Sequence, residues 1–124
     1  MNQKESLKNN RRYDLADRTL VFGKEVIIFA KGIAINTVNR PIVVQLVRSA
    51  TSVGANYMEA DCAESRKDFR HKISICKKES KEAMYWLDVI FDTGLGDQQK
   101  RRCSSLKREA HELTLIFSSI INKL

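Results

Sequence analysis

The sequence contains only one proline and five glycines in 124 residues, so it has few points at which a long helix must end. It also lacks any apolar run near the ~18 residues that a membrane-spanning helix needs, which excludes an integral membrane protein. Residues 1–12 have no apolar centre and therefore do not look like a signal peptide. We expect a single-domain cytoplasmic protein that does not associate with a membrane.

Cysteine is scarce and poorly spaced for metal or redox chemistry. Cys62, Cys76 and Cys103 are odd in number and far apart, and none of them forms a Cys-x-x-Cys pair. We interpret them as reduced thiols that pack like small apolar residues.

Histidine is scarcer still, with two in the chain. Asp68 and His71 have the spacing of one half of a di-iron site in a helical bundle. The second half is missing, because the residue at the matching position before His111 is Arg108. A glycine-rich phosphate loop is also missing. The sequence therefore predicts no metal site, no cofactor and no enzyme activity, and both histidines are expected at the surface.

What the sequence does contain is four helix-length segments in which apolar residues alternate at spacings of three and four. The first is expected to begin near Asp14, its N-cap, and to end about Ile35. Pro41 suits the first turn of the second segment, Ser65 can cap the third, and Asp97 can cap the fourth. Short connections make consecutive helices antiparallel. The prediction is an all-α, antiparallel up-down-up-down four-helix bundle over residues 14–124, preceded by a flexible basic arm over residues 1–13.

Each segment carries one apolar seam that is expected to face the core. Gly54 lies within the second segment, where glycine costs about 1 kcal/mol relative to alanine, so we interpret Ala50 and Gly54 as a close approach between helices. The seams comprise Leu15, Phe22, Val26, Phe29 and Ile33; Ile42, Leu46, Ala50, Val53 and Tyr57; Phe69, Ile73, Cys76, Ser80, Ala83, Leu87 and Ile90; and Leu106, Ala110, Leu113, Phe117, Ile120 and Leu124.

Other apolar residues lie off these seams. A monomer rarely exposes a contiguous apolar patch larger than a few hundred Å². The off-seam residues therefore predict a homo-oligomer, unless they only broaden the contact of each helix with the core. They are Val21, Ile28 and Ile35 in the first segment, Ile75, Trp86 and Val89 in the third, and Leu115 in the fourth.

Positive charge exceeds negative charge, with 22 Lys and Arg against 15 Asp and Glu, a net charge of +7. Cations open the third and fourth segments, where helix amide groups disfavour them unless an anion such as phosphate is bound. The alternative is a solvated basic surface that only keeps the protein soluble. The candidate nucleic-acid-binding residues are Arg66, Lys67, Arg70, Lys77, Lys78, Lys81, Lys100, Arg101, Arg102, Lys107 and Arg108, and Lys4, Lys8, Arg11 and Arg12 are expected to join Arg66 and Lys67 at one end of the bundle.

Polar residues within the second and third segments form a separate group. Asn56 and Glu59 share a helix face, and Arg48 lies about two turns earlier. They are expected to reach Lys78, Glu79 or Glu82 across the bundle, because buried polar groups must be paired. We interpret Arg48, Asn56, Glu59 and Glu82 as a structural polar network that fixes helix register rather than as a reactive site.

The centre of the chain also carries a recognisable pattern. The run from Gln45 to Ala60, QLVRSATSVGANYMEA, is followed by SRKDF at 65–69, KESKEA at 78–83 and YWL at 85–87. This order resembles the bacterial four-helix-bundle family labelled 23S ribosomal RNA intervening-sequence proteins. The resemblance spans roughly residues 14–124, and the central part carries its specificity. It departs after Glu59, where many relatives have glycine and this chain has Ala60.

The resemblance implies an up-down bundle that assembles into a pentameric ring. A related branch, the accessory variability determinant of diversity-generating retroelements, is a basic pentamer that binds nucleic acid and a reverse transcriptase. The family label reflects where some of its genes lie and does not establish a ribosomal task. The resemblance carries over no catalytic residue.

Together these observations predict a non-enzymatic oligomeric bundle that binds nucleic acid, with RNA the expected form, through sequence-independent phosphate contacts. The alternative is a scaffold or accessory subunit that binds another protein through Trp86, Ile75 and the off-seam residues of the first segment, without contacting nucleic acid.

Overall fold

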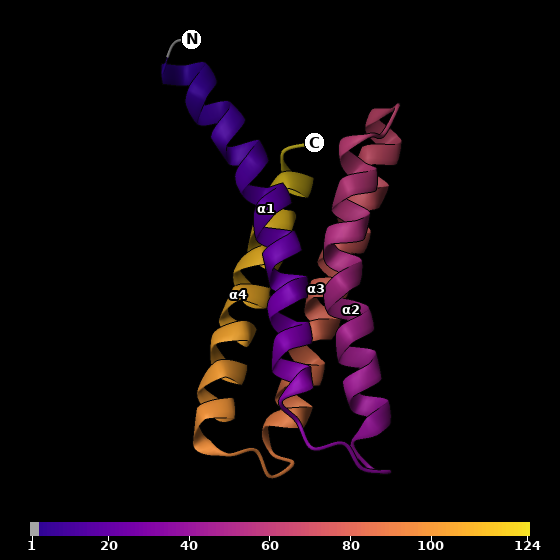
Figure 1. Cartoon of the computed structure of the whole chain (residues 1–124). Coiled ribbons are helices and arrows are strands. Elements are labelled where there is room, and N and C mark those ends of the chain that lie inside the picture. Colours follow the sequence, from indigo (N-terminus) through magenta and orange to yellow (C-terminus); the bar gives the residue numbers. More distant parts are fainter. Residues whose placement is uncertain (1–2) are drawn as a thin grey trace.

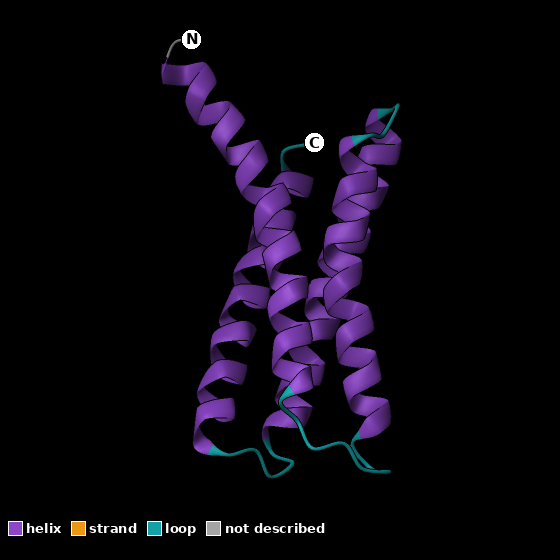
Figure 2. Ribbon diagram, in the orientation of Figure 1, coloured by secondary structure: helices purple, strands orange, loops and turns teal. Residues whose placement is uncertain are grey.

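The computed structural model describes the backbone of residues 3–124 and the side chains of residues 15–124. Its four helices are α1 (Gln3–Lys31), α2 (Arg40–Asp61), α3 (Arg66–Phe91) and α4 (Asp97–Asn122). They run alternately up and down (Figure 1), and the described chain contains helices and loops without strands (Figure 2). Each helix packs against its two neighbours in a closed ring, most closely between α2 and α3 and least closely between α1 and α4. The predicted all-α up-down-up-down bundle is confirmed.

The core contains nearly all of the residues that the seams predict, together with Ala30, Val43, Ala60 and Cys103, and at the start of α2 Val43 is buried rather than the predicted Ile42. Nearly every seam residue is buried, and Ile42, Phe69 and Ile120 pack half-buried against the others. Complete burial of a large apolar side chain contributes about 1.5–3 kcal/mol, so these seams dominate the stability of the bundle. Ser80 is tolerated among them because its hydroxyl lies 2.8 Å from the buried Thr114 hydroxyl.

No helix in the described part of the chain is long and apolar enough to cross a membrane.

Two helix starts agree with the sequence. Pro41 occupies the first turn of α2, where its missing N–H leaves no hydrogen bond unmade. Ser65 is the N-cap of α3, and its Oγ accepts a hydrogen bond from the Asp68 backbone N–H at 3.0 Å.

The expected bounds of α1 are wrong at both ends. The helix begins at Gln3 rather than near Asp14, in keeping with the many Lys, Glu, Leu and Arg residues that favour helix in this stretch. It ends at Lys31 rather than Ile35, because the Asn36 and Asn39 side chains hydrogen-bond to nearby backbone groups and hold a turn instead. The predicted flexible arm over residues 1–13 lies outside the described side chains, and its flexibility stays a prediction.

The expected cap of α4 is also wrong. Gly96, in extended conformation, is the N-cap, and Asp97 is the first helical residue. A carboxylate in the first turn still opposes the partial positive charge of the helix N-terminus, so Asp97 stabilises α4 in a different way.

The close approach predicted at Gly54 is confirmed, and its partner is α1. A Cβ atom on Gly54 would lie 3.3 Å from the Thr19 backbone oxygen. On the facing helix, a Cβ on Gly23 would lie 3.6 Å from the Thr51 Cα, an ordinary contact.

All three cysteines are free, as the sequence predicts. Cys76 is buried with its Sγ 3.6 Å from the Val53 oxygen, and Cys103 is buried with its Sγ 3.2 Å from the Leu87 oxygen. Loss of hydration on burial raises the pKa of Cys76 to about 12 and the pKa of Cys103 to about 11. Cys62 is exposed at the end of α2, so the predicted packing role is wrong for this residue.

The two interhelical glycines give a matched test of this packing. Gly23→Ala should raise the free energy of unfolding by about 0.5–1 kcal/mol, because alanine favours helix and the site has room. Gly54→Ala should raise it less, because the rigid Thr19 backbone crowds the new methyl group. Urea unfolding measures both changes, and an equal gain from the two substitutions would contradict the close approach.

Thiol accessibility gives a second test. The thiolate is the reactive form, so at pH 8 the folded protein should show one fast-reacting thiol with an aromatic disulfide reagent and three after unfolding. Cys62→Ser should remove the fast reaction. Because burial raises the pKa of Cys76 and Cys103 above the ordinary value of about 8.5, stability should fall as pH rises past that value. Two fast-reacting thiols in the folded protein would be inconsistent with this structure.

Candidate nucleic-acid interface

Six of the seven Lys and Arg residues of α3 lie on one outer face of the helix. At about 100° per residue they fall within an arc of roughly 120°. Glu79 and Lys72, which contact α2, lie outside this arc, whereas Asp88, which contacts α4, lies within it. We call this surface the α3 cationic face, which consists of Arg66, Lys67, Arg70, Lys77, Lys78 and Lys81.

Most of the predicted nucleic-acid-binding residues keep their charge open to solvent. Lys77 is half-buried and the others in this group are exposed. None of their side chains makes a hydrogen bond, ion pair or ring contact with another residue whose side chain is described. The group comprises Lys67, Arg70, Lys77, Lys78, Lys81, Arg101 and Arg108.

The remaining predicted residues have partners within the chain. Lys107 pairs with Asp88, Arg102 with Glu25 at 2.8 Å, Lys100 lies 5.5 Å from the centroid of the Phe91 ring, and Arg66 donates to the Leu124 backbone oxygen at 2.8 Å. Three of these contacts fasten α4 to α1 or α3. The cations at the start of α4 are therefore used largely within the bundle, with Arg101 as the exposed exception. Sequence alone did not reveal this, because the partners lie on helices distant in the chain.

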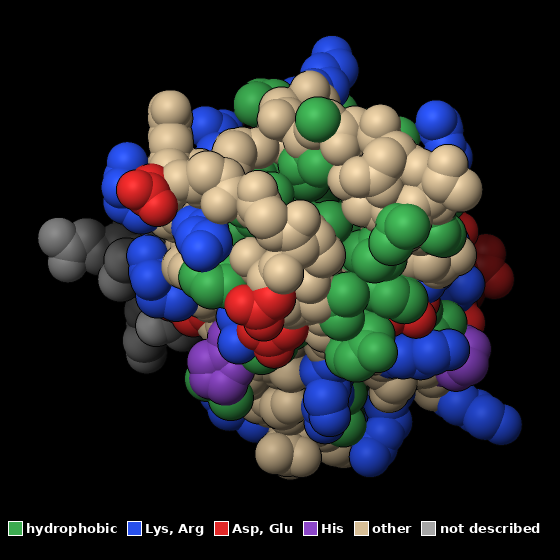
Figure 3. Space-filling model, turned by 90° about the horizontal axis from the view of Figure 1, so that it is seen from below, with side chains coloured by type: hydrophobic (Ala, Val, Ile, Leu, Met, Phe, Trp, Pro, Cys, Tyr) green, Lys and Arg blue, Asp and Glu red, His purple; other side chains and the backbone are tan. Residues whose placement is uncertain are grey.

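The two clusters at helix starts lie at opposite ends of the bundle. α3 begins at the end where the chain terminates, whereas α4 begins at the other end (Figure 1). Figure 3 views the end where α4 begins and shows Lys and Arg side chains around the edge of an apolar patch. The predicted association of Lys4, Lys8, Arg11 and Arg12 with Arg66 falls outside the described side chains. The α3 cationic face extends over more of the length of the bundle than the cluster of cations at the start of α4.

Two acidic residues of α3, Glu79 and Glu82, are held on the side of the helix that faces α2. Arg48 of α2 binds Glu79 at 3.2 Å and also contacts Glu82. Glu79 is buried, so Arg48 compensates a carboxylate that would otherwise be left unpaired. The predicted link from Arg48 to Glu82 is present, and it holds these two carboxylates on the α2 side of α3, whereas Asp88 is paired with Lys107 of α4.

The other two members of the predicted polar network behave differently. Glu59 pairs with Lys72 at 2.9 Å, a residue that was not among its expected partners. This hydrogen bond raises the pKa of Lys72. Asn56 donates to the Ser52 backbone oxygen at 2.8 Å, so its bond stays within α2 rather than crossing the bundle. Side-chain bonding back to the preceding turn competes with cross-helix contacts and is not visible in residue spacing.

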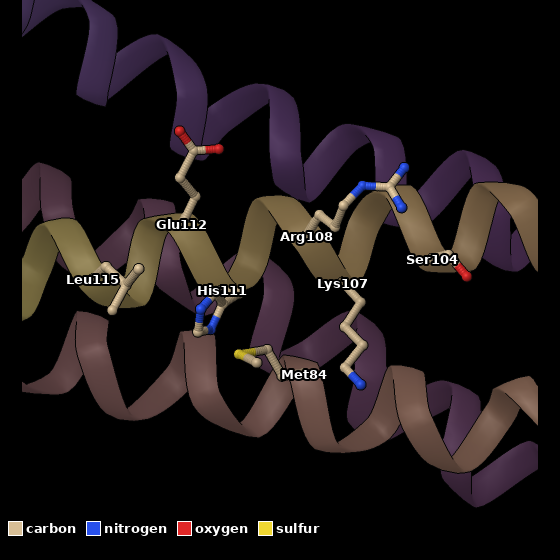
Figure 4. Close-up of a pocket in the computed structure, with 7 residues that line it drawn as sticks. All are labelled: Met84, Ser104, Lys107, Arg108, His111, Glu112 and Leu115. Carbon is tan, nitrogen blue, oxygen red and sulfur yellow. The ribbon is translucent and has the colours of Figure 1, made fainter.

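A groove of about 590 Å³ lies beside α4, along its boundary with α3. Figure 4 shows Lys107 and His111 pointing toward α3, and Glu112 and Arg108 on the other side of α4. Met84 and Leu115 supply apolar surface, and Leu115 is 55% exposed. In this groove His111 lies next to Lys107 and Arg108 of α4, and it is exposed, as expected. The spacing of residues in the sequence did not indicate the groove.

The described residues contain no cluster of three or more His, Cys, Asp and Glu side chains able to hold a metal ion. Asp68 lies instead in the first turn of α3 beside the Ser65 cap.

Comparison with known proteins supports the resemblance noted in the sequence. A crystal structure described as a protein of unknown function from the S23 ribosomal protein family of Bacteroides thetaiotaomicron has a TM-score of 0.76 and 31% identity to this chain. The alignment covers 86% of this chain and 97% of that chain. No curated protein matches the sequence. The model of the family described as 23S rRNA-intervening sequence protein matches residues 11–119. The chain therefore belongs to the 23S rRNA-intervening sequence protein family.

Proposed function

We propose that this chain is a non-enzymatic cytoplasmic protein that binds nucleic acid, RNA in the first place, through phosphate groups on the α3 cationic face. One observation carries the proposal: several cations lie unpaired on one helix face while neighbouring carboxylates are held on the α2 side. Segregated charge of this kind attracts a polyanion from solution and holds it by releasing its counterions.

The length of the face suits a nucleic acid backbone. From Lys67 to Lys81 the helix rises by about 21 Å, at about 1.5 Å per residue. A single strand following this line presents several phosphates to the open cations. Arg108 and Arg101 of α4 add exposed positive charge separate from this face, because Arg108 lies on the side of α4 away from α3 (Figure 4) and Arg101 lines a groove with residues of α1.

The chemistry of the face favours contact without sequence selection. Flexible Lys and Arg side chains on phosphates fix position and orientation but read no base. RNA is the first ligand to test, because the family description refers to an intervening sequence of 23S rRNA.

The exposed apolar residues of α1 favour a second property, self-association. Val21 and Ile28 of α1 are 45% and 53% exposed, and Ile35, in the connection after α1, is 43% exposed, so the predicted off-seam residues are open to solvent. In α3, by contrast, Trp86 packs half-buried against the core and is less suited to docking another protein. The apolar stripe of α1 supports a homo-oligomer, and the pentamer implied by family resemblance and a reverse transcriptase partner stay predictions.

Charge reversal tests the nucleic-acid proposal. Arg70→Glu, Lys77→Glu and Lys81→Glu combined should weaken binding to a labelled RNA strand at least about tenfold at low salt, because phosphate contacts dominate such affinity. The slope of log affinity against log salt should fall by about 2, since each lost contact removes roughly 0.7. Fluorescence anisotropy across about 50–200 mM salt measures both quantities.

The matched control for charge reversal combines Lys24→Glu, Lys31→Glu and Arg40→Glu, which are exposed on α1 and α2 and change the net charge equally. It should bind with near-normal affinity. Equal weakening in the two variants would show that net charge alone determines the affinity, without a particular face. An affinity that does not change with salt concentration would exclude phosphate contacts.

Self-association is tested by sedimentation velocity. The protein should sediment above its 14.2 kDa chain mass at micromolar concentration. Val21→Lys with Ile28→Lys should shift it toward monomer, since charge would replace apolar contact, while helical circular dichroism stays unchanged. Val44→Lys on α2, at a site that is 57% exposed, serves as the control for an exposed apolar site elsewhere. A single species of chain mass in the unmodified protein would rule out the oligomer.

A further inference from the structure

One side chain on the outer side of α3 is neither basic nor small. Tyr85 is 59% exposed, whereas the other aromatic side chains that the structure describes are buried or half-buried. It follows Lys81 by one turn and Lys78 by two, so it extends the line of the α3 cationic face.

The ring of Tyr85 is held in place by its neighbour. Its centroid lies 4.9 Å from that of the Trp86 ring, with the planes at 74°. This edge-to-face geometry is favourable for aromatic pairs and limits the motion of the exposed ring. Trp86 packs half-buried on the core, so the contact ties Tyr85 to the bundle.

The charges before and after Tyr85 along α3 have opposite signs. Lys78 and Lys81 precede it, whereas Asp88 and Asp92 follow it in the next two turns. Asp88 pairs with Lys107 of α4, and Glu82 is held by Arg48 on the α2 side. Phosphates are therefore favoured on the Lys78 side of the ring, and Tyr85 lies where the cationic surface ends.

Building on the proposed function, we propose that Tyr85 is a base-stacking platform that makes this site prefer single-stranded nucleic acid over duplex. An exposed aromatic ring beside a phosphate-binding line can stack on an unpaired base, and every base offers a π-face for this. The bases of a duplex are already stacked and paired, so a ring on the side of a helix cannot reach their faces.

The experiment compares the unmodified protein with Tyr85→Leu and Tyr85→Phe. Tyr85→Leu should weaken binding of labelled RNA and DNA single strands by roughly 5- to 150-fold, the range reported for loss of one stacked base. Its affinity for duplex should be unchanged, and its salt slope should match the unmodified protein, because stacking releases no counterions. Tyr85→Phe keeps the π-face and should bind single strands normally.

Trp86 is the one tryptophan in the chain and touches the Tyr85 ring, so its fluorescence reports on the site directly. Single strands should change this emission in the unmodified protein and in Tyr85→Phe, and much less in Tyr85→Leu. Met58→Ala, at a site on α2 that is 66% exposed, controls for loss of a large exposed side chain and should bind normally.

Two results would overturn the stacking role while leaving the proposed function intact: normal single-strand affinity in Tyr85→Leu, or an equal loss on single strands and duplex. Absence of any binding by the unmodified protein at low salt would instead remove the proposed function and this inference together.

Discussion

The burial of one apolar seam on each helix is the constraint on which the rest of this structure depends. Once residues such as Leu46, Ile73 and Leu113 face the centre, the direction of every other side chain on a rigid helix is fixed. Polar groups can then lie only at a boundary with a neighbouring helix or on the outside. The positions of the charges are a consequence of the core and not an independent choice.

α3 illustrates this division most clearly. Its inner side belongs to the core, its α2 side carries carboxylates paired with Arg48, and its outer side carries open cations. This arrangement is not visible in the order of residues along the chain, because Glu79 and Lys78 are adjacent in sequence yet face different surroundings. The bundle thus gathers a modest excess of positive charge over the part of the outer face of α3 that precedes Tyr85.

The sequence was a good guide to much of the local order, although the cap of α4 and the end of α1 were predicted wrongly. Periodicity identified the seams, and Pro41 and Ser65 marked helix starts through backbone chemistry that operates within a few residues. It was a poorer guide where the answer depends on a distant partner. Arg102 is bound by Glu25 and Lys100 lies on Phe91, and neither pairing follows from the spacing of residues within α4. The start of α1 was missed for another reason, because a polar helix without a seam has no apolar period to detect.

The open cations of α3 are not accounted for by folding. Lys77 and Lys81 are four residues apart on one face, a spacing at which like charges destabilise a helix by about 0.2–0.5 kcal/mol. A glutamate at one of these two positions would have attracted the remaining cation and stabilised the helix, as Glu82 attracts Arg48. Interactions between exposed charges contribute little to stability, so the penalty from this like-charge pair is small, but it is destabilising. Because folding does not require these open cations, a bound ligand explains them better. A polyanion is the ligand whose negative charge would turn their mutual repulsion into a net attraction.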